Sequence, residues 1–309
     1  MSESVDEKMM SECLRLAEKG RGRVSPNPMV GSVFVKDKEI IGRGFHQFFG
    51  GPHAEVNAAD SVVNKGSIKG ATVYVNLEPC AHYGKTPPCA ELLVKLRVKR
   101  VVVGCIDTFS KVQGKGVEIL KKSGISVDVG VLEDQCIDFN RRFFQFHRFK
   151  KPYVILKWAQ TQDGFMAPEK QQERKPFWIT SENSKKLVHQ WRVEEDAIMV
   201  GTTTAIKDNP SLTARLVEGP HPTRIVIDKN LKIPTKSFLL DGEAPTFIFT
   251  ESKECQDQEN LSYIQAPFGT EKLIPFILSF LYKKGLQSLI VEGGPNLLNR
   301  FINLNVWDE

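Results

Sequence analysis

Segments with the pattern of β-strands alternate with helical segments along both halves of the sequence. In the first half, a helical pattern over residues 5–20 and two short strands around a turn at Asp37–Lys38 precede the alternation. Strands that alternate with helices are typical of a layered α/β fold. The further segments with these patterns are 52–63, 71–79, 89–98, 99–107 and 116–131 in the first half, and 152–164, 196–201, 223–228, 246–250 and 288–294 in the second.

The length of the chain predicts two domains. Compact domains cluster near about 100–150 residues, and this chain has 309. A basic and aromatic run at 140–152 interrupts the alternation of strands and helices. We therefore place one α/β domain at residues 1–147 and a second at 150–309.

Composition narrows the class of protein. Hydrophobic residues make up 41% of the chain, and no apolar run approaches the roughly 18–20 residues of a membrane span. The first 20 residues lack the layout of a signal peptide, so we expect a soluble, cytoplasmic protein without a membrane partner. A net charge of +5 with interspersed signs argues against a dedicated nucleic-acid binder. In such a chain the six cysteines favour metal or core roles over disulfides.

Three side chains are candidate ligands of a zinc ion. His53 stands in "PHAEVNAA", and Cys80 and Cys89 stand in "NLEPCAHYGKTPPC". One imidazole and two thiolates suit zinc, and three protein ligands leave a fourth position for water, as in catalytic sites. Glu55 can then lie beside this water and shuttle its proton without binding the metal. The pattern is typical of zinc deaminases, which attack an amino-bearing ring carbon.

The loop between the two cysteines is long for a deaminase. Eight residues separate them, where nucleoside and nucleic-acid deaminases have two. The loop carries His82 and Lys85, which suit an anionic group, and Gly84 allows the backbone to turn closely around it. With residues 26–31 and His46 on the preceding segments, this loop predicts a pocket for a phosphorylated pyrimidine.

These motifs resemble the bifunctional riboflavin-biosynthesis deaminase/reductase family. The resemblance rests on "PNPMVG", "GFH", "PHAEVNA" and "LEPCAHYGKTPPC". It implies a cytidine-deaminase-like three-layer domain that uses zinc to deaminate a diaminopyrimidinone ribosylamino phosphate hydrolytically. Residues 104–116 depart from the family's Asp-Pro-Asn-Pro pattern, of which Asp107 is kept. The substrate contacts implied in this domain are Asn27, His46, His82 and Lys85.

The second half is less specific when its residues are considered alone. Gly293–Gly294 after an apolar strand can present backbone amides to a nucleotide phosphate, although a tight strand-to-helix turn has the same pattern. The hydroxyls, Asp208 and Arg215 within residues 201–215 fit either a binding loop or a capped helix.

Five ordered segments of this half resemble the reductase domain of the same family. They are "LKWAQTQDG", "WIT", "WRVEEDAIMVGTTTAIKDNPSLTAR", "RIVID" and "IVEGGP". The resemblance implies a dihydrofolate-reductase-like fold and an NADPH-dependent reduction of the ribosyl group to ribityl. "TQDG" and Pro176 depart from the usual residues. The implied substrate contacts are Lys157, Arg192, Leu212, Arg215 and Glu292, and the implied cofactor contacts are Ala159, Trp178, Thr204, Asp208 and Gly294.

Two other functions fit part of the sequence. The family has further strands after the motif that 307–309 matches, and either the sequence is clipped there or the reductase lacks an edge. In the second case the alternative function is a deaminase with an inactive, scaffold-like second half. The resemblance also implies a homo-oligomer. A zinc-clamped nucleic-acid-binding module is the alternative from another class, and its closed site would take a fourth ligand such as His82 or Cys105.

Overall fold

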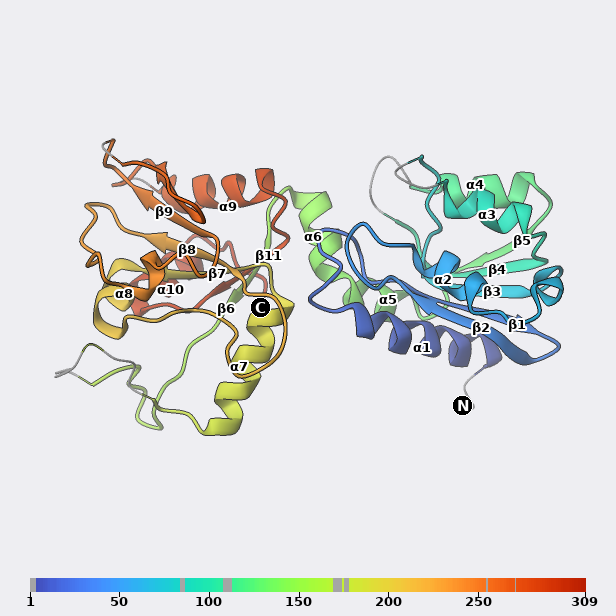
Figure 1. The fold of residues 1–309 in the computed structure, drawn as a ribbon, viewed down its shortest axis with the longest axis horizontal. Helices are drawn as coiled ribbons and strands as arrows, with labels where there is room; N and C mark the ends of the chain where they lie inside the picture. The colour runs from blue at the N-terminus through green and yellow to red at the C-terminus, as the bar shows by residue number, and fades with distance from the viewer. Residues whose placement is uncertain are drawn as a thin grey trace. The chain divides into compact units, whose positions relative to one another are not determined.

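The computed structural model describes residues 4–83, 87–107, 113–168, 174, 178–253, 255–269 and 271–309. The chain divides into two compact units, Met1–Phe149 and Lys150–Glu309. Both units combine strands and helices (Figure 1), so the α/β class expected from the alternating pattern is confirmed. No helix in the described ranges has the length and apolar character that crossing a bilayer requires.

The first unit contains a mixed five-stranded sheet that helices cover on both faces. The strand order is β2-β1-β3-β4-β5, in which β1 is antiparallel to β2 and β3 while β3, β4 and β5 run parallel. The elements are α1 (Val5–Ala17), β1 (Gly31–Lys36), β2 (Glu39–Phe45), α2 (Ala54–Asp60), β3 (Thr72–Leu77), α3 (Cys89–Lys95), β4 (Arg100–Cys105), α4 (Lys115–Lys122), β5 (Ser126–Val129), α5 (Glu133–Phe139) and α6 (Arg141–Phe149), with short 3₁₀ helices at Glu18–Gly20 and Lys65–Ile68.

Alternate residues of the strands build two apolar layers, because successive side chains of a strand point to opposite faces. Val33 of β1 packs in one cluster with Met10 of α1, whereas its neighbour Phe34 packs in the other with Ala58 of α2 and Leu93 of α3. Figure 1 shows α1 on one face of the sheet and α3 and α4 on the other. The three-layer arrangement follows from this alternation.

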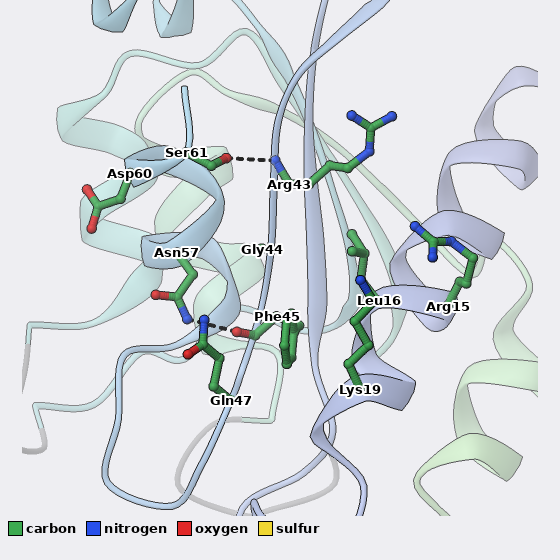
Figure 2. Close-up of a pocket in the computed structure, with 10 residues that line it drawn as sticks. All are labelled: Arg15, Leu16, Lys19, Arg43, Gly44, Phe45, Gln47, Asn57, Asp60 and Ser61. Carbon is green, nitrogen blue, oxygen red and sulfur yellow. Dashed lines mark hydrogen bonds between the residues drawn. The ribbon is translucent and has the colours of Figure 1, made fainter. Parts of the chain in front are cut away.

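Side chains of α2 cap the outer edge of β2. Ser61 Oγ, just after α2, accepts from the Arg43 N–H at 2.8 Å, and Asn57 Nδ2 donates to the Phe45 carbonyl at 2.8 Å (Figure 2). Unpaired edge strands are templates for association, and these caps occupy groups that another strand would use. A hollow of about 460 Å³ lies beside this edge. Figure 2 shows the residues that line it, among them Arg15 and Lys19.

The second unit is a fully parallel six-stranded sheet. The strand order is β10-β9-β8-β7-β11-β6. The elements are β6 (Tyr153–Leu156), α7 (Glu182–Glu194), β7 (Ala197–Gly201), α8 (Thr202–Asp208), β8 (Thr223–Ile227), β9 (Thr246–Thr250), β10 (Leu261–Gln265), α9 (Leu273–Lys283), β11 (Ser288–Val291) and α10 (Pro295–Asn303), with a 3₁₀ helix at Phe238–Leu240.

Helices cover both faces of this parallel sheet. Ile277 of α9 and Leu298 of α10 pack against Met199 of β7 in one cluster, while Ala205 of α8 packs with Ile198 in the other. Strands buried on both faces need continuous apolar stretches, as β7 and β11 have. The last residues lie along β6, where Leu156 N–H donates to the Glu309 carbonyl at 2.8 Å.

Candidate active sites

The three predicted zinc ligands meet at the ends of neighbouring elements. His53 is the residue before α2, Cys80 follows β3, and Cys89 is the first residue of α3. His53 Nδ1 lies 3.5 Å from Cys80 Sγ and 3.4 Å from Cys89 Sγ. One atom from each residue lies within 4.8 Å of the other two, and no other such group of His, Cys, Asp and Glu occurs among the described residues.

The spacing of these atoms fits tetrahedral zinc. With Zn–S near 2.3 Å and Zn–N near 2.0–2.1 Å, a tetrahedral site separates nitrogen from sulfur by about 3.6 Å. The fourth ligands of the alternative closed site are not in the cluster: Cys105 Sγ instead donates to the Asn76 carbonyl at 3.4 Å, and His82 is exposed. The described part of the chain therefore supplies three protein donors, the number typical of catalytic zinc sites.

The electrostatics of the cluster favour a thiolate at Cys80, whereas His53 and Cys89 must each release a proton before they bind a metal. A hydrogen bond from Cys89, assisted by one with His53, lowers the pKa of Cys80 to about 4. The bond to Cys80 raises the pKa of His53 to about 8. Glu55 is 3% exposed, and burial together with the adjacent Cys80 thiolate raises its pKa. A carboxyl group whose pKa moves toward neutrality can accept and return a proton.

Two of the predicted substrate contacts in this unit are hydrogen-bonded to each other. His46 Nδ1 lies 2.9 Å from the Pro52 carbonyl, so this nitrogen carries the proton, and His46 Nε2 then accepts from Asn27 Nδ2 at 2.9 Å. Burial lowers the pKa of His46, which favours this neutral form. The His46 and His53 rings lie 5.6 Å apart, so the pair borders the candidate metal site. Lys85 lies outside the described residues.

Glu78 makes contacts that the sequence analysis did not predict. It is 4% exposed, and its carboxylate accepts from the backbone N–H groups of Asp107, Gly114, Gly116 and Val117 at 2.9–3.3 Å. Glu78 stands two residues before a predicted zinc ligand, in "LEPC", and this position could have indicated a role near the metal site. The carboxylate ties both ends of the loop between β4 and α4 to the strand that leads to the metal site.

Buried asparagines hold the segment that carries Asn27. Asn140 Oδ1 accepts from the Met29 N–H at 2.9 Å, and Asn140 Nδ2 donates to the Met29 carbonyl at 3.0 Å. Asn76 donates to the same carbonyl at 3.1 Å. Because Asn140 is 111 residues from Met29 in the chain, no sequence signal indicated this pairing.

In the second unit, three predicted substrate contacts form one charged network. Glu292 Oε2 lies 3.0 Å from Arg192 Nη2, and Glu292 Oε1 lies 3.6 Å from Lys157 Nζ. Burial opposes the ionisation of Glu292, but attraction to Arg192 and Lys157 outweighs it and lowers the Glu292 pKa. The network places two cations and one carboxylate at the ends of β6, α7 and β11.

The remaining predicted contacts of this unit differ in burial, and two of them are hydrogen-bonded to each other. The Gly294 N–H donates to Thr204 Oγ1 at 2.9 Å, which joins two predicted cofactor contacts. Arg215 Nη1 contacts Ser211 Oγ and Thr213 Oγ1. Pro176 lies outside the described residues. Of the other predicted contacts, Leu212 is buried, Ala159 and Asp208 are half-buried, and Trp178 is exposed under the Lys185 ammonium.

Two family models cover most of the chain. Residues 3–105 match the cytidine and deoxycytidylate deaminase zinc-binding region, and residues 152–309 match the RibD C-terminal domain. The first match includes all three residues of the His–Cys–Cys cluster. The fold and the cluster thus define a zinc-dependent deaminase domain joined to a reductase-type domain.

Curated relatives and solved structures agree over the full chain. The riboflavin biosynthesis protein RibD of Aquifex aeolicus is 41% identical, over 100% of this chain and 86% of its own length, and that of Bacillus amyloliquefaciens is 40% identical, over 99% and 83%. The crystal structure of a diaminohydroxyphosphoribosylaminopyrimidine deaminase/5-amino-6-(5-phosphoribosylamino)uracil reductase from Thermotoga maritima superposes with a TM-score of 0.89 at 39% identity, over 97% of this chain and 84% of that one. RibD of Acinetobacter baumannii gives 0.87 at 35%, over 98% and 85%.

The chain belongs to the RibD family. The family resemblance and the fold class predicted from the sequence motifs are confirmed.

Proposed function

We propose that residues 1–149 form the deaminase and residues 150–309 the reductase of one bifunctional enzyme of riboflavin biosynthesis. Its substrate is 2,5-diamino-6-ribosylamino-4(3H)-pyrimidinone 5′-phosphate, which is deaminated hydrolytically. The ribosyl group of the product is then reduced to ribityl. Zinc and NADPH are the cofactors, and full-length similarity to RibD proteins supports both activities.

The observation that carries the deaminase assignment is the three-atom cluster of His53, Cys80 and Cys89 beside a buried acid. When bound, zinc supplies Lewis acidity that activates a water molecule, and NADPH supplies hydride in the second reaction. Glu55 holds the proton taken from the water and returns it to the departing ammonia, for which its raised pKa is suited.

Residues around the cluster bind the phosphorylated pyrimidine. The neutral His46 ring and Asn27 form one polar pair beside the metal site. His82 and Lys85, on the loop between the cysteines, contribute further contacts, with Lys85 suited to the phosphate. These four roles follow from the family motif, and the hydrogen bond between Asn27 and His46 supports the first two.

In the reductase unit, the charged network binds the ribosylamino phosphate. Lys157 and Arg192 supply donors for the sugar and phosphate, and Glu292 supplies an acceptor. The Leu212 backbone and the Arg215 side chain supply further contacts. These contacts hold the sugar in one orientation against the nicotinamide, and such positioning accelerates the transfer of hydride. The proposed cofactor contacts are Ala159, Trp178, Thr204, Asp208 and Gly294, of which Thr204 and Gly294 are hydrogen-bonded to each other.

A homo-oligomeric state and a cytoplasmic location stay predictions. Light scattering on the purified chain tests the first, and cell fractionation tests the second.

Substitution of Glu55 tests the function. Glu55→Ala should abolish ammonia release from the diaminopyrimidinone while the protein retains zinc. The same variant should still oxidise NADPH when it is given the deaminated intermediate, which controls for folding. Loss of zinc together with loss of activity would identify Glu55 as a ligand and contradict its assignment as the proton carrier.

A further inference from the structure

Helix α7 presents two buried side chains to the loop that follows α8. His189 and Arg192 are 3% and 8% exposed. Residues three apart lie on the same face of a helix. Both side chains contact the segment 213–216, which includes Arg215, a proposed substrate contact.

His189 binds the backbone of this segment through one nitrogen. Its Nδ1 accepts from the Arg215 N–H at 2.8 Å and from the Leu216 N–H at 3.4 Å. A ring nitrogen accepts only when it carries no proton, so His189 is neutral with its proton on Nε2. Burial, with the nearby cations Arg192 and Arg215, lowers the pKa of His189 to about 4, so the ring is neutral at physiological pH.

Arg192 holds the preceding peptide group and connects the loop to the charged network. Its Nη1 donates to the Thr213 carbonyl at 3.2 Å, while its Nη2 pairs with Glu292. The Ala214 N–H donates to His221 Nδ1 at 3.3 Å. Among the described residues these groups have no backbone partner, and side chains satisfy them instead.

The Arg215 side chain extends from the backbone segment that His189 and Arg192 hold by hydrogen bonds. Its Nη1 contacts the hydroxyls of Ser211 and Thr213. A guanidinium carries five donors, and no other hydrogen bond of this side chain occurs within the described ranges, so donors remain for an anionic ligand. The direction of those donors depends on the φ and ψ angles of Arg215, and the bond to His189 restrains the peptide group that begins this residue.

We propose that His189 is a positioning residue of the reductase, which orients Arg215 toward the phosphorylated pyrimidine by accepting the Arg215 and Leu216 amide hydrogens. The inference rests on the proposed reductase function and on the proposed role of Arg215. It assigns to His189 no contact with the substrate.

Paired substitutions of His189 separate positioning from general support of the fold. Asn places its Oδ1 close to the position of the His Nδ1, so His189→Asn keeps the acceptor, whereas His189→Ala removes it. One lost hydrogen bond of this kind corresponds to about tenfold in binding. In the full-length enzyme, His189→Ala should raise the KM for the deaminated pyrimidine about tenfold, with the KM for NADPH and the deaminase rate unchanged. His189→Asn should restore a KM within about threefold of wild type.

Two further variants complete the experiment. Gln190→Ala, at the exposed neighbouring position of α7, is the matched control and should leave both KM values unchanged. In an Arg215→Ala background, His189→Ala should add little, because the residue that it positions is gone.

The inference is overturned if the KM values for pyrimidine and NADPH rise together, if Asn fails to rescue, or if the effect of His189→Ala is equally large without the Arg215 side chain. Wild-type enzyme that does not oxidise NADPH would refute the proposed reductase function, and the inference with it. An active wild type with an unaffected His189→Ala variant would refute the inference alone.

Discussion

At the scale of single residues, the second unit buries charges in pairs. The Arg192 and Glu292 side chains are 9% and 11% exposed, and their charged atoms lie 3.0 Å apart. Removing one partner of such a pair leaves the other charge without compensation in a medium of low dielectric. By contrast, the Lys185–Glu182 pair on α7 includes a carboxylate that is 77% exposed. The two pairs should therefore respond very differently to substitution.

Glu292→Ala should destabilise the second unit by roughly 3–5 kcal/mol, because Arg192 stays buried without its partner. All four tryptophans of the chain, at 158, 178, 191 and 307, belong to this unit, so tryptophan fluorescence during urea unfolding measures its stability selectively. Glu182→Ala is the control and should cost at most about 0.5 kcal/mol. Equal losses in the two variants would contradict the account of the buried pair.

Because His189 is buried in its neutral form, we expect the free energy of unfolding of the second unit to depend on pH. Its pKa is about 4 in the folded chain, against 6.5 for an ordinary histidine. As the pH falls, the unfolded chain therefore binds a proton first, and stability that is fully present above about pH 6.5 is lost toward pH 4. The groups that act on this ring are Arg192 and Arg215, which lower its pKa, and Glu292, which raises it.

Urea unfolding followed by tryptophan fluorescence at pH 7 and pH 5 measures this loss. Wild type should lose more stability between the two values than His189→Asn, which has no titrating group at this position. Identical losses in the two proteins would show that His189 does not titrate differently on folding.

At the scale of elements, Glu78 connects β3 to the start of α4. Two of its partners, the Gly116 and Val117 N–H groups, belong to the first turn of α4, whose amides have no partner within the helix. A carboxylate there is also favoured by the helix dipole. The approach is close, because a Cβ at Gly116 would lie 2.0 Å from the Pro79 carbonyl oxygen.

Glu78→Gln should destabilise the first unit by about 2–3 kcal/mol, because the amide places an N–H₂ group against backbone donors. Hydrogen exchange of the α4 amides should accelerate in this variant. Glu118→Gln, at an exposed position of the same helix, is the control and should leave exchange almost unchanged. Unaltered exchange in Glu78→Gln would contradict the assignment of this contact.

The sequence predicted the elements of the fold better than their pairing. Local signals were sufficient for the hairpin, because Asp37 and Lys38 both take the positive φ angles of a tight two-residue turn. They also led to His53, Cys80 and Cys89 as candidate zinc ligands, which the structure brings together, since a distinctive residue type at each position marks a chemical requirement. The order of strands in the second sheet, with β11 between β7 and β6, depends on packing between distant segments and has no local signal.

The same distinction separates predicted site residues from those that were missed. Residue type and motif led to Glu55, Arg192 and Glu292 as candidate site residues, and their roles stay predictions. His189 and Asn140 act through backbone groups 26 and 111 residues away, and any sequence near those groups would offer the same N–H. Contacts of this kind can be recognised only once the tertiary structure shows which distant segments lie together.

At the scale of the whole molecule, each unit contains its own core and its own set of proposed site residues. The cluster of His53, Cys80 and Cys89 lies in the first unit, and the Glu292 network lies in the second. Chemistry that depends on the metal is therefore expected to be confined to one unit.

Removal of the metal should separate the two activities. Treatment with a zinc chelator should abolish ammonia release and leave NADPH oxidation of the supplied deaminated intermediate within about twofold of the untreated rate, because the proposed reductase residues include no metal ligand. Steady-state assays of both reactions on one sample provide the measurement. Parallel loss of both activities would show that the second unit also depends on the metal.

Zinc K-edge X-ray absorption of the purified full-length enzyme measures the ligands of the proposed metal site. We expect one zinc per chain with two sulfur neighbours at about 2.3 Å and two lighter neighbours, a histidine nitrogen and a water oxygen, at about 2.0–2.1 Å. The spectrum should be nearly unchanged in Glu55→Ala. A first shell with three or more sulfurs, or one that changes when Glu55 is removed, would contradict an open site with a proton-carrying acid beside it.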